Sequence, residues 1–460
     1  MTLRPLHRTL DYLATTAVIV VTVLCLFYAA DRVSGLMQDE PFDHAIFSKA
    51  GEQFALTGHF YPHVTEPYPT FLPGAAVFKF PPVYQLFIAP WVKNGITPAY
   101  YRNSYLACLF AYISGVLLLC RFALPKQGIG EKPLSPCLTV CTISILISVA
   151  CVFEPFYSGF LLLVGEIPIF ACCVLALVLS VRHPFFSGVL IALAACTKLY
   201  PIFMMLYALA ALDTKPRFAW LAGFASSAIL LWSLTLLLFG WQEPLYYITH
   251  ILPVLLHEHP MGISENLSLI FFLFPDGITH VFAENMFTVI RIITLGLLAL
   301  AIIFYKKHRT ATPQHDALLY GLFITSMIIC LANYWIQYEV LLLIPAVLVL
   351  TTSLQRRQPV LTMTAALLLL VLLSSQELDD TLMSAAAGPD LVSLLAKAEQ
   401  KGYWLTMWET SPAAFVLMLL ADIKPLAPYG LWVSSAWLLL QKQMLQKSIM
   451  QKQTANNARA

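Results

Sequence analysis

Long apolar runs separated by short polar segments recur along the whole chain. Each run of about 17–25 residues can cross the roughly 30 Å of hydrocarbon in a bilayer, so each predicts a transmembrane helix. The first run, residues 11–30, is too long for a removable signal peptide and lacks a small-residue cleavage site, so we expect a retained helix. The pattern predicts about 12 spans, near residues 11–30, 103–121, 137–153, 158–180, 185–197, 199–212, 218–240, 286–305, 317–334, 338–354, 359–375 and 412–440.

The charged residues divide between the connections in a way that predicts orientation. The short connections are basic, and by the positive-inside rule they lie in the cytoplasm together with both termini. Most acidic residues fall instead in three longer segments, which we expect to be outer loops at residues 31–102, 241–285 and 376–411. Their aromatic and proline residues favour helical structure lying against the membrane surface.

The composition agrees with this reading. The chain is 59% hydrophobic and 11% charged, whereas soluble globular domains are about a quarter charged. We therefore predict an all-α polytopic membrane protein, with one transmembrane domain over residues 1–440 and a polar cytoplasmic tail at 441–460. The ten cysteines lie in or beside apolar runs and none lies in the long outer loops, which indicates helix packing rather than a disulfide framework.

Motifs for nucleotide-driven or zinc chemistry are absent from the sequence, which has no P-loop, no glycine-rich nucleotide cradle and no H-E-x-x-H. His257 and His259, with the nearby His250, resemble a metal cluster only loosely, because residues two apart on a helix point in different directions. Surface histidines are the alternative. We predict no cofactor and no nucleic-acid partner, and the sequence offers no support for a divalent metal.

One apolar segment contains a charge and a helix breaker. The segment between Arg182 and Lys215, both expected in the cytoplasm, must cross the membrane twice, in halves of about 20 Å each. The turn between the halves holds Lys198, Tyr200 and Pro201. Charge and broken helix at membrane depth are tolerated where they line a cavity or are buried in protein. Lys198 is therefore a candidate ligand for a lipid phosphate; the alternative is that it snorkels to the interface.

Carboxylates concentrate just after the first apolar run, where Asp39, Glu40 and Asp43 lie within five positions. Beside low-dielectric walls a carboxylate gains proton affinity and can act as a general base, but a solvated loop start has the same composition. Another acid, Glu166, stands near the predicted outer start of a later run. It either pairs with Lys198 or lines a polar cavity.

Polar and aromatic residues also gather in NYWIQYE, residues 333–339. Trp335, Gln337 and Glu339 stand there at the predicted outer end of a late span. Aromatic belt residues are the ordinary occupants of such a position, and cavity-lining residues are the alternative.

Several short motifs follow one another along the chain. Asp43 is followed by the aromatic Phe47 and then by G-x-x-Y at Gly58 and Tyr61. The later motifs are FPPVYQLFIAP at 80–90, KLYP at 198–201, NLSL at 266–269 and a tryptophan, Trp335, at the end of a late span. In this order they resemble GT-C class glycosyltransferases that use polyprenol-phosphate sugars, specifically the bacterial polyprenol-phosphate-mannose α-mannosyltransferases of glycosyltransferase family 87.

The chain departs from that family at two places. The family's Gly-Gln-x-Asn is GEIP here, at residues 165–168, and the histidines typical after the late tryptophan are replaced by Gln337, Tyr338 and Glu339. These positions would face donor or acceptor in the family, so the resemblance leaves the sugar and the acceptor open.

The resemblance implies a GT-C-like fold and an inverting transfer. Asp43 would act as the general base, supported by Glu40 and Asp39, while Lys198 would stabilise the departing lipid phosphate. We assign the remaining candidates to two groups. Donor-binding candidates are Lys198, Tyr200, Glu166, Lys79, Asn266 and Ser268, and candidates for the acceptor or the cavity wall are Trp335, Gln337, Glu339, His257 and His259.

The expected function is transfer of mannose, or a pentose such as arabinofuranose, from a polyprenyl-phosphate donor. The acceptor hydroxyl would belong to a glycan, lipid or protein of the cell envelope, on the outer face of the inner membrane. A transporter or flippase for a lipid-linked glycan is the alternative, because discontinuous helices mark substrate sites in transporters. A non-catalytic assembly partner in an envelope complex is a third reading.

Overall fold

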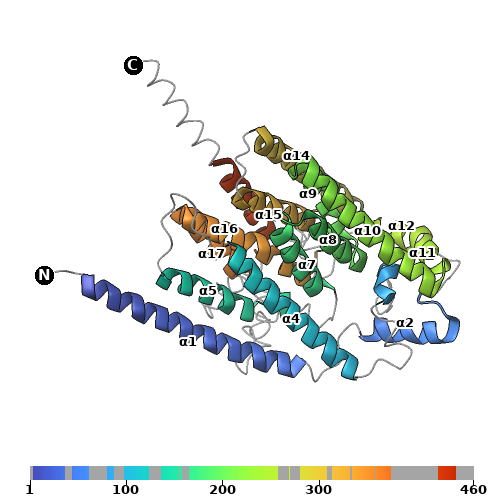
Figure 1. Cartoon of the computed structure of the whole chain (residues 1–460), viewed down its shortest axis with the longest axis horizontal. Coiled ribbons are helices and arrows are strands. Elements are labelled where there is room, and N and C mark those ends of the chain that lie inside the picture. Colours follow the sequence, from blue (N-terminus) through green and yellow to red (C-terminus); the bar gives the residue numbers. More distant parts are fainter. Residues whose placement is uncertain are drawn as a thin grey trace, which may run out of the picture.

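The structure, a computed structural model, describes thirteen stretches of the chain, and within them every regular element is a helix (Figure 1). The described residues are 4–36, 44–61, 80–86, 98–123, 136–153, 155–157, 165–256, 269, 280–307, 313–331, 334–356, 358–373 and 423–441. This agrees with the predicted all-α fold.

The helices follow one another in the following order. The first half of the chain contains α1 (Arg4–Leu36), α2 (His44–Thr57), η1 (Pro82–Tyr84), α4 (Pro98–Ala123), α5 (Pro136–Cys151), α7 (Glu166–Leu179), α8 (Pro184–Thr197), η2 (Tyr200–Phe203), α9 (Met204–Ala211) and α10 (Thr214–Phe239). The second half contains α11 (Gln242–Tyr246), η3 (Tyr247–Ile251), α12 (Leu252–Leu256), α14 (His280–Lys307), α15 (Pro313–Ile329), η4 (Ile336–Leu342), α16 (Leu343–Gln355), α17 (Pro359–Leu373), η6 (Lys424–Leu426) and a helix at 427–441.

Five helical stretches of the described residues are long and apolar enough to cross a membrane. They are Thr15–Leu36, Arg102–Ala123, Thr214–Phe239, Glu284–Lys307 and Ile336–Gln355. Shorter apolar helices lie between them, so the chain is a membrane protein. The count of about 12 spans and the cytoplasmic termini stay predictions.

Burial separates a central helix from peripheral ones. The apolar window of Ile336–Gln355 is 83% buried within the protein, whereas those of Thr15–Leu36 and Thr214–Phe239 are each 11% buried. A helix that is apolar on all sides and buried belongs to the interior of a bundle, and one that exposes apolar side chains suits contact with lipid. The region formed by η4 and α16 is therefore the centre of the bundle.

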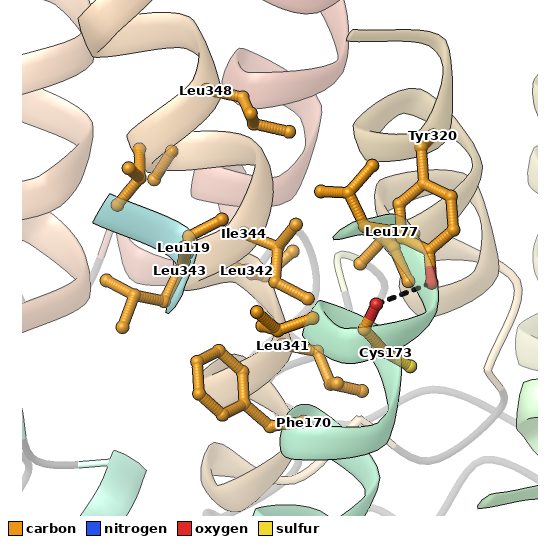
Figure 2. Close-up of a cluster of buried hydrophobic side chains, with 14 of the residues drawn as sticks. Leu119, Phe170, Cys173, Leu177, Tyr320, Leu341, Leu342, Leu343, Ile344 and Leu348 are labelled. Atoms are coloured by element: carbon orange, nitrogen blue, oxygen red, sulfur yellow. Dashed lines mark hydrogen bonds between the residues drawn. The ribbon is translucent and has the colours of Figure 1, made fainter. Parts of the chain in front are cut away.

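The largest apolar core surrounds this central stretch (Figure 2). Leu341 and Ile344 pack against Phe170 and other side chains of α7, and Tyr320 of α15 donates a hydrogen bond of 2.9 Å to the backbone carbonyl of Cys173. A side-chain hydrogen bond between membrane helices contributes about 0.6 kcal/mol on average, so the apolar packing supplies most of the stability here.

Small residues allow the closest helix approach in the bundle, between α8 and α10. A Cβ atom on Gly188 would lie 2.0 Å from the carbonyl oxygen of Trp220, and one on Gly223 would lie 2.0 Å from that of Phe185. Apolar surfaces gain little from association inside lipid, so close van der Waals packing at small residues holds membrane helices together instead. The tight contact fixes the first half of α8 against α10.

A second, smaller apolar cluster joins the two predicted outer loops at 31–102 and 241–285. It lies in what we call the α2–α11 layer, made of residues 44–61, 80–86 and 241–256, where Figure 1 shows α2 beside α11 and α12. Phe47 and Tyr61 pack there with Tyr246 and Tyr247. Segments far apart in the sequence therefore form one helical layer.

Candidate functional site

The helix break predicted around Lys198 is present. Helix α8 ends at Thr197, Lys198 has extended backbone angles (φ −141°, ψ 143°), and η2 begins at Tyr200 before the chain continues into α9. Pro201 has no backbone N–H and cannot continue the hydrogen-bond pattern of α8. The break therefore follows from the KLYP sequence itself.

A close contact between α7 and α8 sets Glu166 beside Lys198. Gly165, which precedes α7, lies so near Thr197 that an added Cβ would be 2.6 Å from the threonine Cγ2. At this approach the Lys198 Nζ donates to Glu166 Oε1 in a salt bridge. The Glu166 side chain is 0% exposed and that of Lys198 is 16% exposed. Of the two interpretations left open for Glu166, pairing with Lys198 is the one observed.

Aromatic rings surround this ion pair. The Lys198 Nζ lies 5.1 Å from the ring centroid of Tyr338 and 5.8 Å from that of Phe80, within cation–π range. The Tyr338 ring lies 5.3 Å from the Tyr200 ring. We call these five residues, Phe80, Glu166, Lys198, Tyr200 and Tyr338, the Lys198 cluster.

Two polar atoms of the Lys198 cluster have unmet hydrogen-bonding capacity. Glu166 Oε2 and the Tyr200 hydroxyl are buried, and neither has a hydrogen-bond partner in the part of the chain that the structure describes. Most buried polar groups in proteins are paired, because an unpaired one costs about 1–3 kcal/mol. Unpaired polar atoms at a break in a helix mark a candidate binding site.

A second lysine–glutamate pair joins Glu339 of η4 to Lys424. Glu339 Oε2 is 3.0 Å from Lys424 Nζ, and its Oε1 accepts a 2.9 Å hydrogen bond from the Tyr334 hydroxyl. Glu339 is 0% exposed and Lys424 is 1% exposed. Glu339 Oε1 thus has a hydrogen-bond partner, whereas Oε2 has the ion-pair contact with Lys424 and no hydrogen bond among the described residues. The pair is buried inside the bundle.

A third buried carboxylate, Glu243 of α11, holds the α2–α11 layer together. It contacts His59 Nδ1 at 2.8 Å, and it accepts hydrogen bonds from the Phe60 backbone N–H at 3.3 Å and the Gln85 side-chain amide at 3.1 Å. Glu243 is fully buried. One side chain therefore connects three segments of the layer.

The G-x-x-Y motif has a structural explanation in the same layer. Gly58 adopts φ +76°, a left-handed conformation that glycine adopts without strain, and it ends α2 with a hydrogen bond to the Phe54 carbonyl. The chain then turns so that the buried Tyr61 donates a 2.7 Å hydrogen bond to the carbonyl of Phe80. Phe80 belongs to the Lys198 cluster, so the motif connects α2 to that cluster.

Tyr247 completes the packing of the layer. It is almost fully buried, and its ring centroid lies 6.0 Å from that of Tyr61. Burial raises the pKa of the Tyr247 hydroxyl above its ordinary value, so the group stays protonated at neutral pH.

The described residues bring together three of the predicted donor-binding residues, Glu166, Lys198 and Tyr200. Three predicted cavity residues lie at or in η4: Trp335, Gln337 and Glu339. The contact of η4 with Lys198 is made by Tyr338. The other predicted site residues lie outside the described residues: Asp39, Glu40, Asp43, Lys79, His257, His259, Asn266 and Ser268.

Sequence reasoning missed Glu243 and Lys424. Glu243 follows a span and looks like an ordinary loop acid, since its partners come from distant segments. Lys424 did carry a signal, because it is a charge within the apolar stretch 412–440, and such charges are generally paired or functional.

The described residues contain no group of three or more histidine, cysteine, aspartate or glutamate side chains that could hold a metal ion. A cavity of about 10 Å³ lies near Tyr334 and Tyr429. It has room for about one water molecule, too little for a sugar, so it is not the donor site.

Comparison with known proteins yields one match. A family model described as Glycosyltransferase family 87 matches residues 78–333, a range that includes the whole Lys198 cluster apart from Tyr338. No curated protein and no solved structure matches the chain.

Proposed function

The chain belongs to glycosyltransferase family 87, and from this premise we propose that it moves a sugar from a polyprenyl-phosphate donor to an acceptor hydroxyl. The sugar is mannose or a pentose such as arabinofuranose, and the acceptor is a glycan, lipid or protein. The reaction takes place on the outer face of the cytoplasmic membrane.

The observation that carries the proposal is the Lys198 cluster. A lysine and a carboxylate, with two unpaired polar atoms beside them, lie at a helix break in an otherwise apolar bundle and among aromatic rings. Polar groups are retained in such surroundings where they serve a ligand or a structural pair. A lipid-linked sugar phosphate combines a lipid tail, a phosphate and a sugar, and the cluster together with the apolar bundle offers complementary chemistry for each.

The proposed chemistry is an inverting displacement with Asp43 as the general base. Asp43 accepts the proton of the acceptor hydroxyl, and the hydroxyl oxygen forms a bond to the anomeric carbon from the face opposite the phosphate. The bond between that carbon and the phosphate oxygen breaks, and the lipid phosphate leaves with the bonding electrons. Lys198 lowers the barrier by stabilising the negative charge on the leaving phosphate.

The position of Asp43 in the sequence supports this role. Asp43 directly precedes His44, the first residue of α2, and α2 packs in the α2–α11 layer. The same layer reaches the Lys198 cluster through Phe80. Residues at the start of α2 are thus connected to the proposed donor site through a packed helical layer.

Transport of a lipid-linked glycan is a second candidate, and one observation favours it. The helical stretch of α8 and α9 is interrupted beside a charged residue, Lys198. Interrupted helices carry substrate sites in many transporters. Membership of a glycosyltransferase family favours transfer over transport.

The test uses purified protein in nanodiscs with polyprenyl-phosphate mannose or polyprenyl-phosphate arabinofuranose. Each donor is offered with a glycolipid, an oligosaccharide and a peptide as acceptor. We expect one donor to be consumed, and Asp43→Asn to lower turnover about 100- to 10,000-fold. Asp31→Asn, at an exposed position of α1, is the matched control.

Three outcomes separate the alternatives. No transfer by the wild type from either donor contradicts the proposed function. Wild-type transfer that Asp43→Asn leaves unchanged contradicts the base assignment alone. Movement of a lipid-linked glycan across a proteoliposome membrane without any transfer favours transport.

A further inference from the structure

The charges of the Lys198 cluster already balance, which limits the part of a donor that can bind there. The positive charge of Lys198 is matched by the carboxylate of Glu166. A phosphate that approached Glu166 Oε2, which has no partner, would meet a like charge. An ionised carboxylate accepts hydrogen bonds and donates none, so the unmet requirement is for a hydrogen-bond donor. A sugar hydroxyl is such a donor, and a fully ionised phosphate is not.

Tyr200 adds a second buried polar atom that needs a hydrogen-bond partner, beside Glu166 Oε2. Its hydroxyl is buried and lacks a hydrogen-bond partner among the described residues, and it can either donate or accept. Leaving both atoms unpaired costs free energy in the unliganded protein, and a ligand that pairs them recovers it. A sugar ring carries hydroxyls on adjacent carbons and can serve two such groups at once.

The remaining members of the cluster suit the same ligand. Phe80 and Tyr338 present ring faces within 6 Å of the Lys198 Nζ, at 5.8 Å and 5.1 Å, and apolar C–H groups of a sugar can pack on such faces. Lys198 is partly exposed, and its ammonium group carries three N–H donors. It can therefore contact a glycosyl phosphate while it stays paired with Glu166.

We infer that the Lys198 cluster recognises the sugar of the donor, and that Glu166 and Tyr200 determine which sugar is accepted. Glu166 Oε2 accepts a hydrogen bond from one sugar hydroxyl, and the Tyr200 hydroxyl bonds a neighbouring sugar oxygen. The sugar reaches these buried atoms past Lys198 and Tyr338, which are both partly exposed side chains. This inference rests on the proposed function, since it takes a lipid-linked sugar as the ligand.

The first experiment separates sugar binding from lipid-phosphate binding. The wild type, Glu166→Leu and Tyr200→Phe are each titrated in nanodiscs with polyprenyl phosphate and with the polyprenyl-phosphate sugar that the wild type uses. We expect both variants to weaken binding of the sugar-bearing lipid about 10- to 100-fold, the range for a lost hydrogen bond to a charged group. Binding of polyprenyl phosphate itself should not weaken, because the cluster contacts it through Lys198 and loss of the Glu166 carboxylate removes a like charge.

Two control variants test whether removal of a buried hydroxyl or of a carboxylate elsewhere in the protein also weakens binding of the sugar-bearing lipid. Tyr247→Phe removes another buried hydroxyl that lacks a partner, in the α2–α11 layer, and should leave the preference for the sugar-bearing lipid unchanged. Glu52→Gln removes a carboxylate at an exposed position of α2. Size-exclusion profiles and thermal unfolding confirm that each variant is folded, and Tyr200→Phe keeps the test valid if Glu166→Leu does not fold.

The second experiment pairs each variant with donors that lack one hydroxyl. For the wild type, one deoxy donor should lose about 10- to 100-fold in kcat/KM. With Glu166→Leu, that same deoxy donor and the parent donor should react at similar rates, because leucine has no acceptor and the hydrogen-bond pair is already broken.

The outcomes are decisive for the inference. Equal weakening of both lipids, or of neither, contradicts it, as does a deoxy penalty that is the same in the wild type and both variants. Such results would leave wild-type transfer intact and the proposed function standing. A wild type that transfers no sugar contradicts the proposed function and the inference together.

Discussion

Two lysine–glutamate pairs involve η4: one contains Glu339 of η4, and the other contacts η4 at Tyr338. They differ in how far their side chains are buried. The Glu339–Lys424 pair is sealed, with 0% and 1% exposure, and the Tyr334 hydroxyl occupies the other carboxylate oxygen. The Glu166–Lys198 pair has the same charges, but Lys198 is 16% exposed and Glu166 Oε2 has no partner in the described protein. Glu339 has a polar neighbour at both carboxylate oxygens, whereas Glu166 has one at a single carboxylate oxygen.

The difference indicates a division of roles. A fully buried ion pair whose two carboxylate oxygens each have a polar neighbour adds rigidity and specifies one arrangement of its helices. An ion pair with an unmatched acceptor retains a cost that a ligand can remove. The sealed pair holds η4 in place, and Tyr338, the residue before Glu339, extends over Lys198. The structural pair thereby positions one wall of the candidate binding site.

Removing one partner of the sealed pair should produce the largest change in stability. Lys424→Ala leaves the Glu339 carboxylate buried without its counter-charge, and we expect a loss of about 3–5 kcal/mol in the free energy of unfolding. Denaturant unfolding in detergent measures this loss. The double variant Glu339→Leu with Lys424→Met removes both charges and should lie within about 1 kcal/mol of the wild type. A single and a double variant of equal stability would contradict the structural role of the pair.

Removing the lysine of the open pair should instead affect activity more than stability. Lys198 is 16% exposed, so its removal in Lys198→Ala lets water reach Glu166, and the stability loss should be smaller, about 1–3 kcal/mol. On the proposed mechanism, in which Lys198 stabilises the leaving phosphate, turnover of the lipid-linked donor should fall about 100- to 1000-fold. Steady-state kinetics with the donor measures this change. Lys49→Ala, at an exposed position of α2, is the matched control.

The contrast between the two lysines is the informative result. If Lys198→Ala and Lys424→Ala lose stability and activity in the same proportion, the two pairs serve the same purpose. The distinction between an open and a sealed pair would then be wrong.

Glu243 offers an intermediate case, since it is buried with a matched set of partners but belongs to the α2–α11 layer. Glu243→Ala removes the acceptor of the Phe60 N–H and of the Gln85 amide, and we expect a loss of about 1–3 kcal/mol. Hydrogen exchange should locate the loss at residues 58–61 and 80–86, with the central bundle unchanged. Uniform loss of protection across α7 and α16 would show that Glu243 supports the whole fold rather than the layer.

The apolar runs predicted the helical membrane fold because span length is set by bilayer thickness, a constraint that acts locally on the sequence. The break at Lys198 was predictable for a similar reason. A lysine followed by a proline inside an apolar run carries both a charge and a missing N–H, and each is visible without any partner.

The sequence alone did not determine which charged residues pair with one another. The contact of Glu166 with Lys198 depends on the close approach of Gly165 to Thr197, a property of packed helices. Lys424 and Glu339 come from separate spans, and Glu243 finds its partners in two other segments. Sequence pattern identifies where a buried charge must be satisfied, but folding decides which residue satisfies it.

The smallest expected effect tests how the α2–α11 layer is joined to the open pair. Tyr61→Phe removes the hydrogen bond from the Tyr61 hydroxyl to the Phe80 carbonyl and keeps the buried ring, so the stability loss should be about 1 kcal/mol. Phe80 lies beside Lys198, and its small displacement should raise KM for the lipid-linked donor a few-fold while kcat stays nearly constant. Tyr247→Phe, in the same layer, removes a hydroxyl that has no hydrogen-bond partner among the described residues and should change neither constant by more than about twofold. A Tyr61→Phe enzyme with unaltered KM would show that the layer and the open pair act independently, and the Asp43 assignment would lose the structural connection that supports it.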